Sequence, residues 1–141
     1  MKFYEAESVI GAPLATVWNV ITDGAAYPEW DSGVTAIDGT IAEGARIKVH
    51  TEASPKQAFP VHVTLSANHR VMTWTGGMPF GLFRGVRVFD LEATDDGGSH
   101  LRVREEYTGP MLPLIWRSMP DLQPSFDQYV AGVKARAEAR S

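Results

Sequence analysis

The sequence predicts an α+β fold in which a curved, seven-stranded antiparallel sheet wraps around a long C-terminal helix. A strand-like stretch and two short helical segments come first. Six strand-like segments then follow without a crossover helix between them, so they must pair antiparallel. The end of the chain carries the one long apolar stripe at helical spacing, and this helix can cover the apolar face of the sheet.

The N-terminal part predicts one strand followed by two short helices. Residues 3–10 alternate between polar and apolar types, and Gly11-Ala12-Pro13 ends this strand. A proline is well placed in the first turn of a helix, and the apolar residues of 14–21 recur at helical spacing. Asp23-Gly24 ends this helix, and a second short helical turn reaches residues 27–30.

Six further strands complete the predicted sheet, at residues 34–38, 45–51, 61–65, 71–75, 84–93 and 99–107. The run Asp95-Asp96-Gly97-Gly98 predicts a hairpin between the last two. Pairing across this turn places Arg87 opposite Glu105 or Tyr107.

The C-terminal stretch predicts one long helix. Its apolar residues recur at steps of three and four, the pattern of a helix with one buried face: Ile115, Met119, Leu122, Phe126, Tyr129 and Val133. Pro120 and Pro124 lie inside this stretch, and an interior proline costs about 3 kcal/mol. Because the apolar phase continues past both prolines, we expect a single helix with a kink near residues 119–123.

The composition is that of an ordinary globular domain, and we expect one ligand-binding domain over residues 1–141. Hydrophobic residues make up 44% and charged residues 21%. The net charge of −4 argues against nucleic acid as a partner. The chain has no cysteine, which suits a reducing compartment, and no apolar run long enough for membrane insertion. We therefore expect a cytoplasmic monomer or homodimer.

Several motifs resemble those of the START-like, or SRPBCC, superfamily, and its polyketide cyclase/dehydrase-like branch is the most similar. The N-terminal motifs are Ile10-x-Ala12-Pro13-x-x-x-Val17-Trp18, Asp23 and Tyr27-Pro28-x-Trp30. The later ones are Val71-x-x-Trp74-x-Gly76, Pro79-Phe80-Gly81-Leu82-Phe83, Arg87-x-Phe89-x-Leu91-Glu92 and Leu101-x-Val103-x-Glu105-x-Tyr107-x-Gly109. The resemblance implies a helix-grip fold with a ligand cavity between helix and sheet. It implies no invariant catalytic residue, because the family has none.

Strand alternation places several charged and polar side chains on the inner face of the sheet. Phe89 sets the inward phase of its strand, so Arg87 and Phe83 share that face. Val103 does the same for Glu105 and Tyr107 on the next strand. A buried charge needs a partner, so Arg87 and Glu105 should pair. This pair is either a structural ion pair or a polar anchor that orients a carbonyl, enol or carboxylate of a ligand.

Apolar candidates complete the predicted binding site: Trp74, Phe80, Phe83, Phe89, Trp116, Met119, Phe126 and Tyr129. Each could equally be part of the core. The glycine-rich segment 76–83 carries several apolar residues that a loop rarely exposes without a use, and we interpret it as a lid over the cavity.

No metal or cofactor is expected. His50, His62, His69 and His100 are scattered, and no carboxylate accompanies the first two as a metal site would require. The chain also lacks a phosphate loop, a dinucleotide fingerprint and a nucleophile elbow.

Three functions remain open at this point. The leading one is binding, for transport or sequestration, of a hydrophobic small molecule such as a lipid, an aromatic or a polyketide-like compound. The alternative is a polyketide cyclase or dehydratase with Glu105 as base and Arg87 and Tyr107 as oxyanion donors. Binding is favoured because a neighbouring arginine stabilises the ionised carboxylate, which opposes its use as a base. The third is an interaction protein, which a filled interior would favour over a cavity of several hundred Å³.

Overall fold

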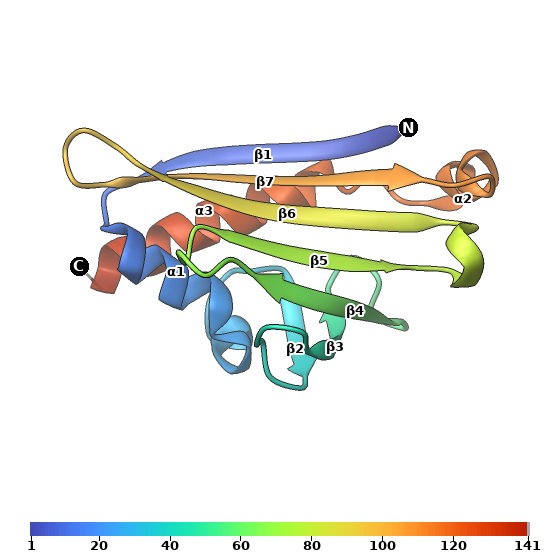
Figure 1. The fold of residues 1–141 in the computed structure, drawn as a ribbon, viewed down its shortest axis with the longest axis horizontal. Coiled ribbons are helices and arrows are strands. Elements are labelled where there is room, and N and C mark those ends of the chain that lie inside the picture. Colours follow the sequence, from blue (N-terminus) through green and yellow to red (C-terminus); the bar gives the residue numbers. More distant parts are fainter. Residues whose placement is uncertain (141) are drawn as a thin grey trace.

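The computed structural model describes residues 1–140 and contains a seven-stranded sheet in the order β1-β7-β6-β5-β4-β3-β2, with every neighbouring pair antiparallel. The strands are β1 (Lys2–Ile10), β2 (Val34–Asp38), β3 (Arg46–Thr51), β4 (Ala58–Leu65), β5 (Val71–Gly77), β6 (Arg84–Ala93) and β7 (Ser99–Thr108). Strands β2 to β7 pair in chain order, and the first strand, β1, pairs with the last strand, β7 (Figure 1). The predicted sheet is confirmed.

Helices α1 (Leu14–Thr22) and α3 (Gln123–Arg140) pack on the sheet, and the 3₁₀ turn η1 (Gly24–Glu29) follows α1. Helix α2 (Leu112–Ser118) and the 3₁₀ turn η2 (Pro79–Gly81) lie at the end of the sheet where β5 and β7 finish (Figure 1). Helix α3 packs against β1 and α1 (Figure 1). It buries one face: Phe126, Tyr129, Val130, Val133 and Ala137. Its glycine, Gly132, passes so close to the loop after η1 that a Cβ atom would lie 2.2 Å from the Asp31 carbonyl oxygen.

The prediction of one kinked C-terminal helix is wrong. Helix α2 ends at Ser118, and Met119 is extended with φ −73° and ψ 138°. The ring of Pro120 disfavours a helical conformation for the residue before it, which explains the break. Pro124 lies in the first turn of α3, where its missing N–H costs nothing. The apolar phase continued across the break because Leu122, in the connection, still packs on the same core.

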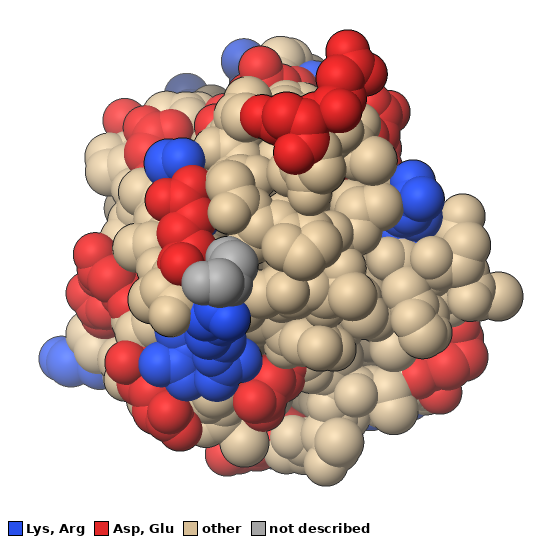
Figure 2. Space-filling view, turned by 90° about the vertical axis from the view of Figure 1, so that its left-hand side faces the viewer, with Lys and Arg blue, Asp and Glu red and all other residues tan. Residues whose placement is uncertain are grey.

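Two further observations concern the length of the helices and the charges on one face of the molecule. No helix within residues 1–140 is both long and apolar enough to cross a bilayer. At the end of the molecule where α3 finishes, acidic and basic side chains form small separate groups, and neither sign covers the face (Figure 2).

Candidate functional site

Four side chains form a row across the concave face of the sheet. Trp74 on β5 lies opposite Arg87 on β6, Arg87 lies opposite Glu105 on β7, and Glu105 lies opposite Tyr4 on β1. Residues directly opposite each other in antiparallel strands share a face and touch. The register predicted from the hairpin turn is confirmed, and it brings two charges into a row of aromatic rings.

Arg87 and Glu105 form an ion pair in this row. Arg87 Nε donates to Glu105 Oε1 over 2.6 Å, and the side chains are 23% and 17% exposed. Burial lowers the pKa of Arg87, but the negative charge of Glu105 and the hydrogen bond to it outweigh burial, so the pKa is raised overall. The guanidinium also lies 4.6 Å from the ring centre of Phe126 on α3, a favourable cation–π contact. Arg87 therefore stays charged and is held from both the sheet and the helix.

A glycine on β6 makes room for the acidic and phenolic groups. Gly85 lies between Gly76 on β5 and Tyr107 on β7. A Cβ atom at Gly85 would lie 3.0 Å from Glu105 Oε2 and 3.5 Å from the Tyr107 ring. Because Gly85 has no side chain, the Glu105 carboxylate and the Tyr107 ring can lie over its strand.

Two buried hydrogen-bond donors at this site have no partner within residues 1–140: Trp74 Nε1 and the Tyr107 hydroxyl. Trp74 is 4% and Tyr107 2% exposed. Burial, and after it the charge of Glu105, raises the pKa of Tyr107 well above its usual value, so the hydroxyl keeps its proton. The Glu105 carboxylate is close enough to raise this pKa both by its charge and as a side-chain acceptor, but the two groups lie outside ordinary hydrogen-bond geometry. A buried donor without a partner costs about 1–3 kcal/mol.

By contrast, the hydroxyl groups of two other buried tyrosines, Tyr27 and Tyr129, both form hydrogen bonds. The Tyr129 hydroxyl donates to that of Tyr27 over 2.8 Å, and Tyr27 donates to the Ile21 carbonyl. Burial raises the pKa of both phenols. The unpartnered donors are therefore a feature of the Arg87–Glu105 row and not of the whole interior.

Aromatic rings surround the unpartnered Tyr107 hydroxyl. The Tyr107 ring lies 6.0 Å from Phe83, 5.7 Å from Trp116 and 6.0 Å from Tyr4. Trp116, on α2, is half-buried and stacks on Tyr4 at 5.4 Å. These contacts close the space between the sheet, α2 and α3.

The structure brings most of the predicted site residues into this region: Trp74, Phe83, Arg87, Phe89, Glu105, Tyr107, Trp116, Phe126 and Tyr129. Phe80 is not among them, because it is 98% exposed at the tip of η2. Met119 lies half-buried in the connection between α2 and α3. Sequence reasoning missed Tyr4, although its alternation with the buried Ala6 and Ile10 on β1 would have placed it inside.

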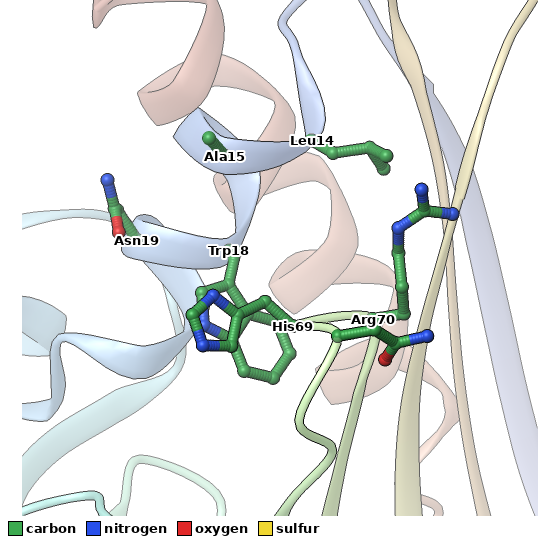
Figure 3. Close-up of a pocket in the computed structure, with 7 residues that line it drawn as sticks. Leu14, Ala15, Trp18, Asn19, His69 and Arg70 are labelled. Carbon is green, nitrogen blue, oxygen red and sulfur yellow. The ribbon is translucent and has the colours of Figure 1, made fainter.

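Two pockets lie outside this row. One, of about 260 Å³, lies between α1 and the β4–β5 turn, where the His69 ring stacks on Trp18 at 5.4 Å (Figure 3). The other, of about 480 Å³, lies at the ends of β4 and β5. Neither is lined by Trp74, Arg87 or Phe126, the residues expected to line the ligand cavity.

The histidines are not grouped for metal binding. His50 has a carboxylate partner that the sequence reading did not anticipate, Asp38, with 2.9 Å between Nε2 and Oδ2. Within residues 1–140 no cluster of three or more histidine, cysteine or acidic side chains is placed to hold an ion.

One family model and several solved structures are similar to this chain. A family model described as polyketide cyclase / dehydrase and lipid transport matches residues 3–138. A search of the curated proteins found no match. Among solved structures, the Zhui aromatase/cyclase from Streptomyces sp. R1128 is similar, with a TM-score of 0.78 at 15% identity over 99% of this chain and 94% of that one.

Two further structures share the fold. A START superfamily protein from Mycobacterium smegmatis has a TM-score of 0.72 at 14% identity, over 99% of both chains. A point mutant of norcoclaurine synthase from Thalictrum flavum, solved with a transition state analogue, has a TM-score of 0.72 at 13% identity, over 99% of this chain and 96% of that one. At these identities the likeness establishes the helix-grip architecture.

Proposed function

The chain belongs to the polyketide cyclase / dehydrase and lipid transport family, and on that premise we propose that it binds a hydrophobic small molecule beside Arg87 and Glu105. One observation carries the proposal. Two buried donors, Trp74 Nε1 and the Tyr107 hydroxyl, lack partners next to a charged pair on the concave face. Buried polar groups are normally hydrogen-bonded, so an unpaired group at a candidate site needs an explanation. A ligand oxygen would supply the missing acceptor.

The side chains define the chemistry of the ligand. Its body is apolar and flat, because rings from Tyr4, Phe83, Trp116 and Phe126 would surround it. Its polar end carries a carbonyl or similar acceptor for the two donors. An aromatic ketone, a polyketide-like compound or a lipid with a carbonyl head group has these features. Carriage or sequestration of such a compound is the function that this arrangement supports best.

Entry of the ligand requires a side chain to move. Trp116 is the candidate, because it is half-buried and lies directly on Tyr107 and Tyr4. Helix α2, which carries it, spans only Leu112–Ser118 and buries Leu112 alone. A short helix with few buried contacts opens at low free-energy cost. We propose that the ligand takes the place of the Trp116 ring.

A cyclase or dehydratase is the second candidate. Glu105 Oε1 is engaged by Arg87, but Oε2 lies toward Gly85 and forms none of the hydrogen bonds seen within residues 1–140. A carboxylate oxygen next to a protonated phenol is an arrangement that could remove an α-proton and stabilise the resulting enolate. This alternative requires the same ligand and adds a reaction.

Two naphthalene derivatives of nearly equal shape test the binding proposal. 2-Acetylnaphthalene carries a carbonyl, and 2-ethylnaphthalene does not. Calorimetric titration should show the ketone binding roughly fivefold more tightly, because one neutral hydrogen bond to a buried donor contributes about 1 kcal/mol. Tyr107→Phe should reduce this preference, whereas Tyr129→Phe, which removes a hydroxyl that already has a partner, should keep it.

The outcome that contradicts the binding proposal is equal affinity for the two compounds, or no binding of either. Turnover separates carrier from enzyme. Incubation with a synthetic poly-β-ketone should give no cyclised product if the protein is a carrier. Product formed by the natural protein and lost in Glu105→Gln, with ligand binding retained, would establish the enzyme instead.

A further inference from the structure

The second pocket lies where two neighbouring strands separate. Strand β4 pairs with β5 from Leu65↔Met72 to His62↔Thr75, and there the pairing stops. Beyond this point β4 continues beside β3, and β5 continues beside β6 as far as Gly77. The pocket of about 480 Å³ opens in this split, next to η2. It shares Phe83 with the surroundings of Tyr107, but none of the four side chains of the Arg87–Glu105 row lines it.

The walls of the split carry positive charge without a counter-ion. Arg46 on β3 and Arg84 on β6 line the pocket from its two sides, with His62 on the strand between them. Both arginines are exposed, and neither takes part in any ion pair formed by residues 1–140. No aspartate or glutamate lines the pocket. In a chain with net charge −4, this lining favours an anion.

Apolar side chains and bare backbone form the remaining walls. Val61, Met78 and Phe83 line the split beside the two arginines. Gly76 and Gly77 also line it, and there the backbones of neighbouring segments approach closely. A Cβ atom on Gly76 would lie 2.8 Å from the Pro60 carbonyl oxygen, and one on Gly77 would clash with that of Phe83. At these two positions the wall of the pocket is therefore main chain, whose amides are within the pocket lining.

We propose that this split binds the anionic group of an amphipathic molecule, a carboxylate or phosphate on an apolar chain. Arg46 and Arg84 hold the anion through charge-assisted hydrogen bonds. The first carbons of the chain lie against Met78 and Phe83. The site does not depend on the ligand proposed for the Arg87–Glu105 row and can be occupied with that row empty.

Three probes of equal chain length test the charge requirement: decanoate, decyl phosphate and decan-1-ol. Calorimetric titration at low salt should show binding of at least one of the two anions, and the tighter one identifies the head group. Decan-1-ol should bind at least tenfold more weakly. The double variant Arg46→Ala/Arg84→Ala should lose at least tenfold in affinity for the anion. Arg102→Ala removes the same charge from another exposed place on the sheet and should change the affinity less than twofold.

Two-dimensional NMR locates the bound probe. The backbone amides of Gly76 and Gly77 should shift on addition of the anion, and these shifts should disappear in the double variant and in Thr75→Phe, which fills the pocket. Equal binding of decan-1-ol, unchanged affinity in the double variant, or shifts confined to the Trp74 indole N–H would overturn the proposal. Shifts confined to Trp74 would at the same time support the ligand site beside Arg87, so the two proposals fail separately.

Discussion

Breaking the Arg87–Glu105 pair should destabilise the protein measurably. Glu105→Gln removes the negative charge and leaves the Arg87 guanidinium 23% exposed among aromatic rings. Removing one partner of a fully buried pair costs about 3–5 kcal/mol, and an exposed pair contributes about 0–1 kcal/mol. Because this pair is mostly but not fully buried, we expect a loss of about 2 kcal/mol in the free energy of unfolding.

A double-mutant cycle isolates the pair. Arg87→Met and Glu105→Leu, the two single changes of the cycle, should each cost about as much as Glu105→Gln, since each leaves one charge unpaired. The variant Arg87→Met/Glu105→Leu removes both charges and fills the same space, so it should lie within about 1 kcal/mol of the natural protein. Urea unfolding at pH 7 with unchanged m-values is the assay. Glu29→Gln, which breaks the exposed Arg136–Glu29 pair, is the control and should cost less than about 0.5 kcal/mol.

The reasoning is refuted if Glu105→Gln is as stable as the natural protein, or if the double variant is as unstable as the sum of its single changes. Either result would mean that the two charges are solvated independently. Their proximity to the unpartnered donors would then have no energetic meaning.

Three further predictions concern the fold. Alanine normally stabilises a helix relative to glycine. Gly132→Ala should instead lower the free energy of unfolding by more than about 2 kcal/mol, because the new Cβ atom would clash with the Asp31 carbonyl. A rise in the urea midpoint would contradict this prediction. Phe80, 98% exposed with φ 62°, should accept asparagine with a small gain, about 0.5 kcal/mol, and a loss of stability on urea unfolding would count against it. Stability should fall as pH rises above about 10, the pKa of a tyrosine in the unfolded chain. Phenols whose pKa is raised in the folded protein stabilise it below that unfolded pKa, and this stabilisation is lost as pH rises above it. Absorbance at 295 nm should therefore change together with the far-ultraviolet circular dichroism, and ionisation of all the buried phenols in the intact fold would refute the prediction. The phenols concerned are Tyr27, Tyr107 and Tyr129.

Strand pairing was predictable because its determinants are local. The hairpin turn at residues 95–98 fixes the register of β6 on β7, and the alternation of Phe89 and Val103 fixes which face is buried. Together these predict Arg87 opposite Glu105 or Tyr107 on the inner face, and the structure has Glu105 there. The cross-strand contact of two charges followed from the same two facts.

The helical end of the chain was less predictable, because periodicity reports which side of a segment is buried and not whether the segment is continuous. Leu122 faces the core from a non-helical connection, so the apolar phase survived a true break at Met119. The dihedral restriction that Pro120 places on its predecessor was the better signal.

The packing of side chains around Tyr107 could not be predicted from the sequence. Whether Trp116 and Phe83 leave a cavity or close over Tyr107 depends on side-chain rotamers and on where α2 lies, and neither follows from spacing. The unpartnered state of Trp74 Nε1 is likewise a property of three-dimensional packing. A cytoplasmic location and a monomeric or homodimeric state remain predictions from composition alone.

The Trp74 indole N–H signal in a ¹H–¹⁵N NMR spectrum is the most direct test of the ligand site, with Trp74→Phe used to assign it. Addition of 2-acetylnaphthalene should move this signal downfield, as a carbonyl oxygen accepts its hydrogen bond, and 2-ethylnaphthalene should not reproduce the shift. A Trp74 signal unmoved by saturating ketone, or one moved equally by both compounds, would contradict the claim that the donors beside Arg87 and Glu105 bind an acceptor on a ligand.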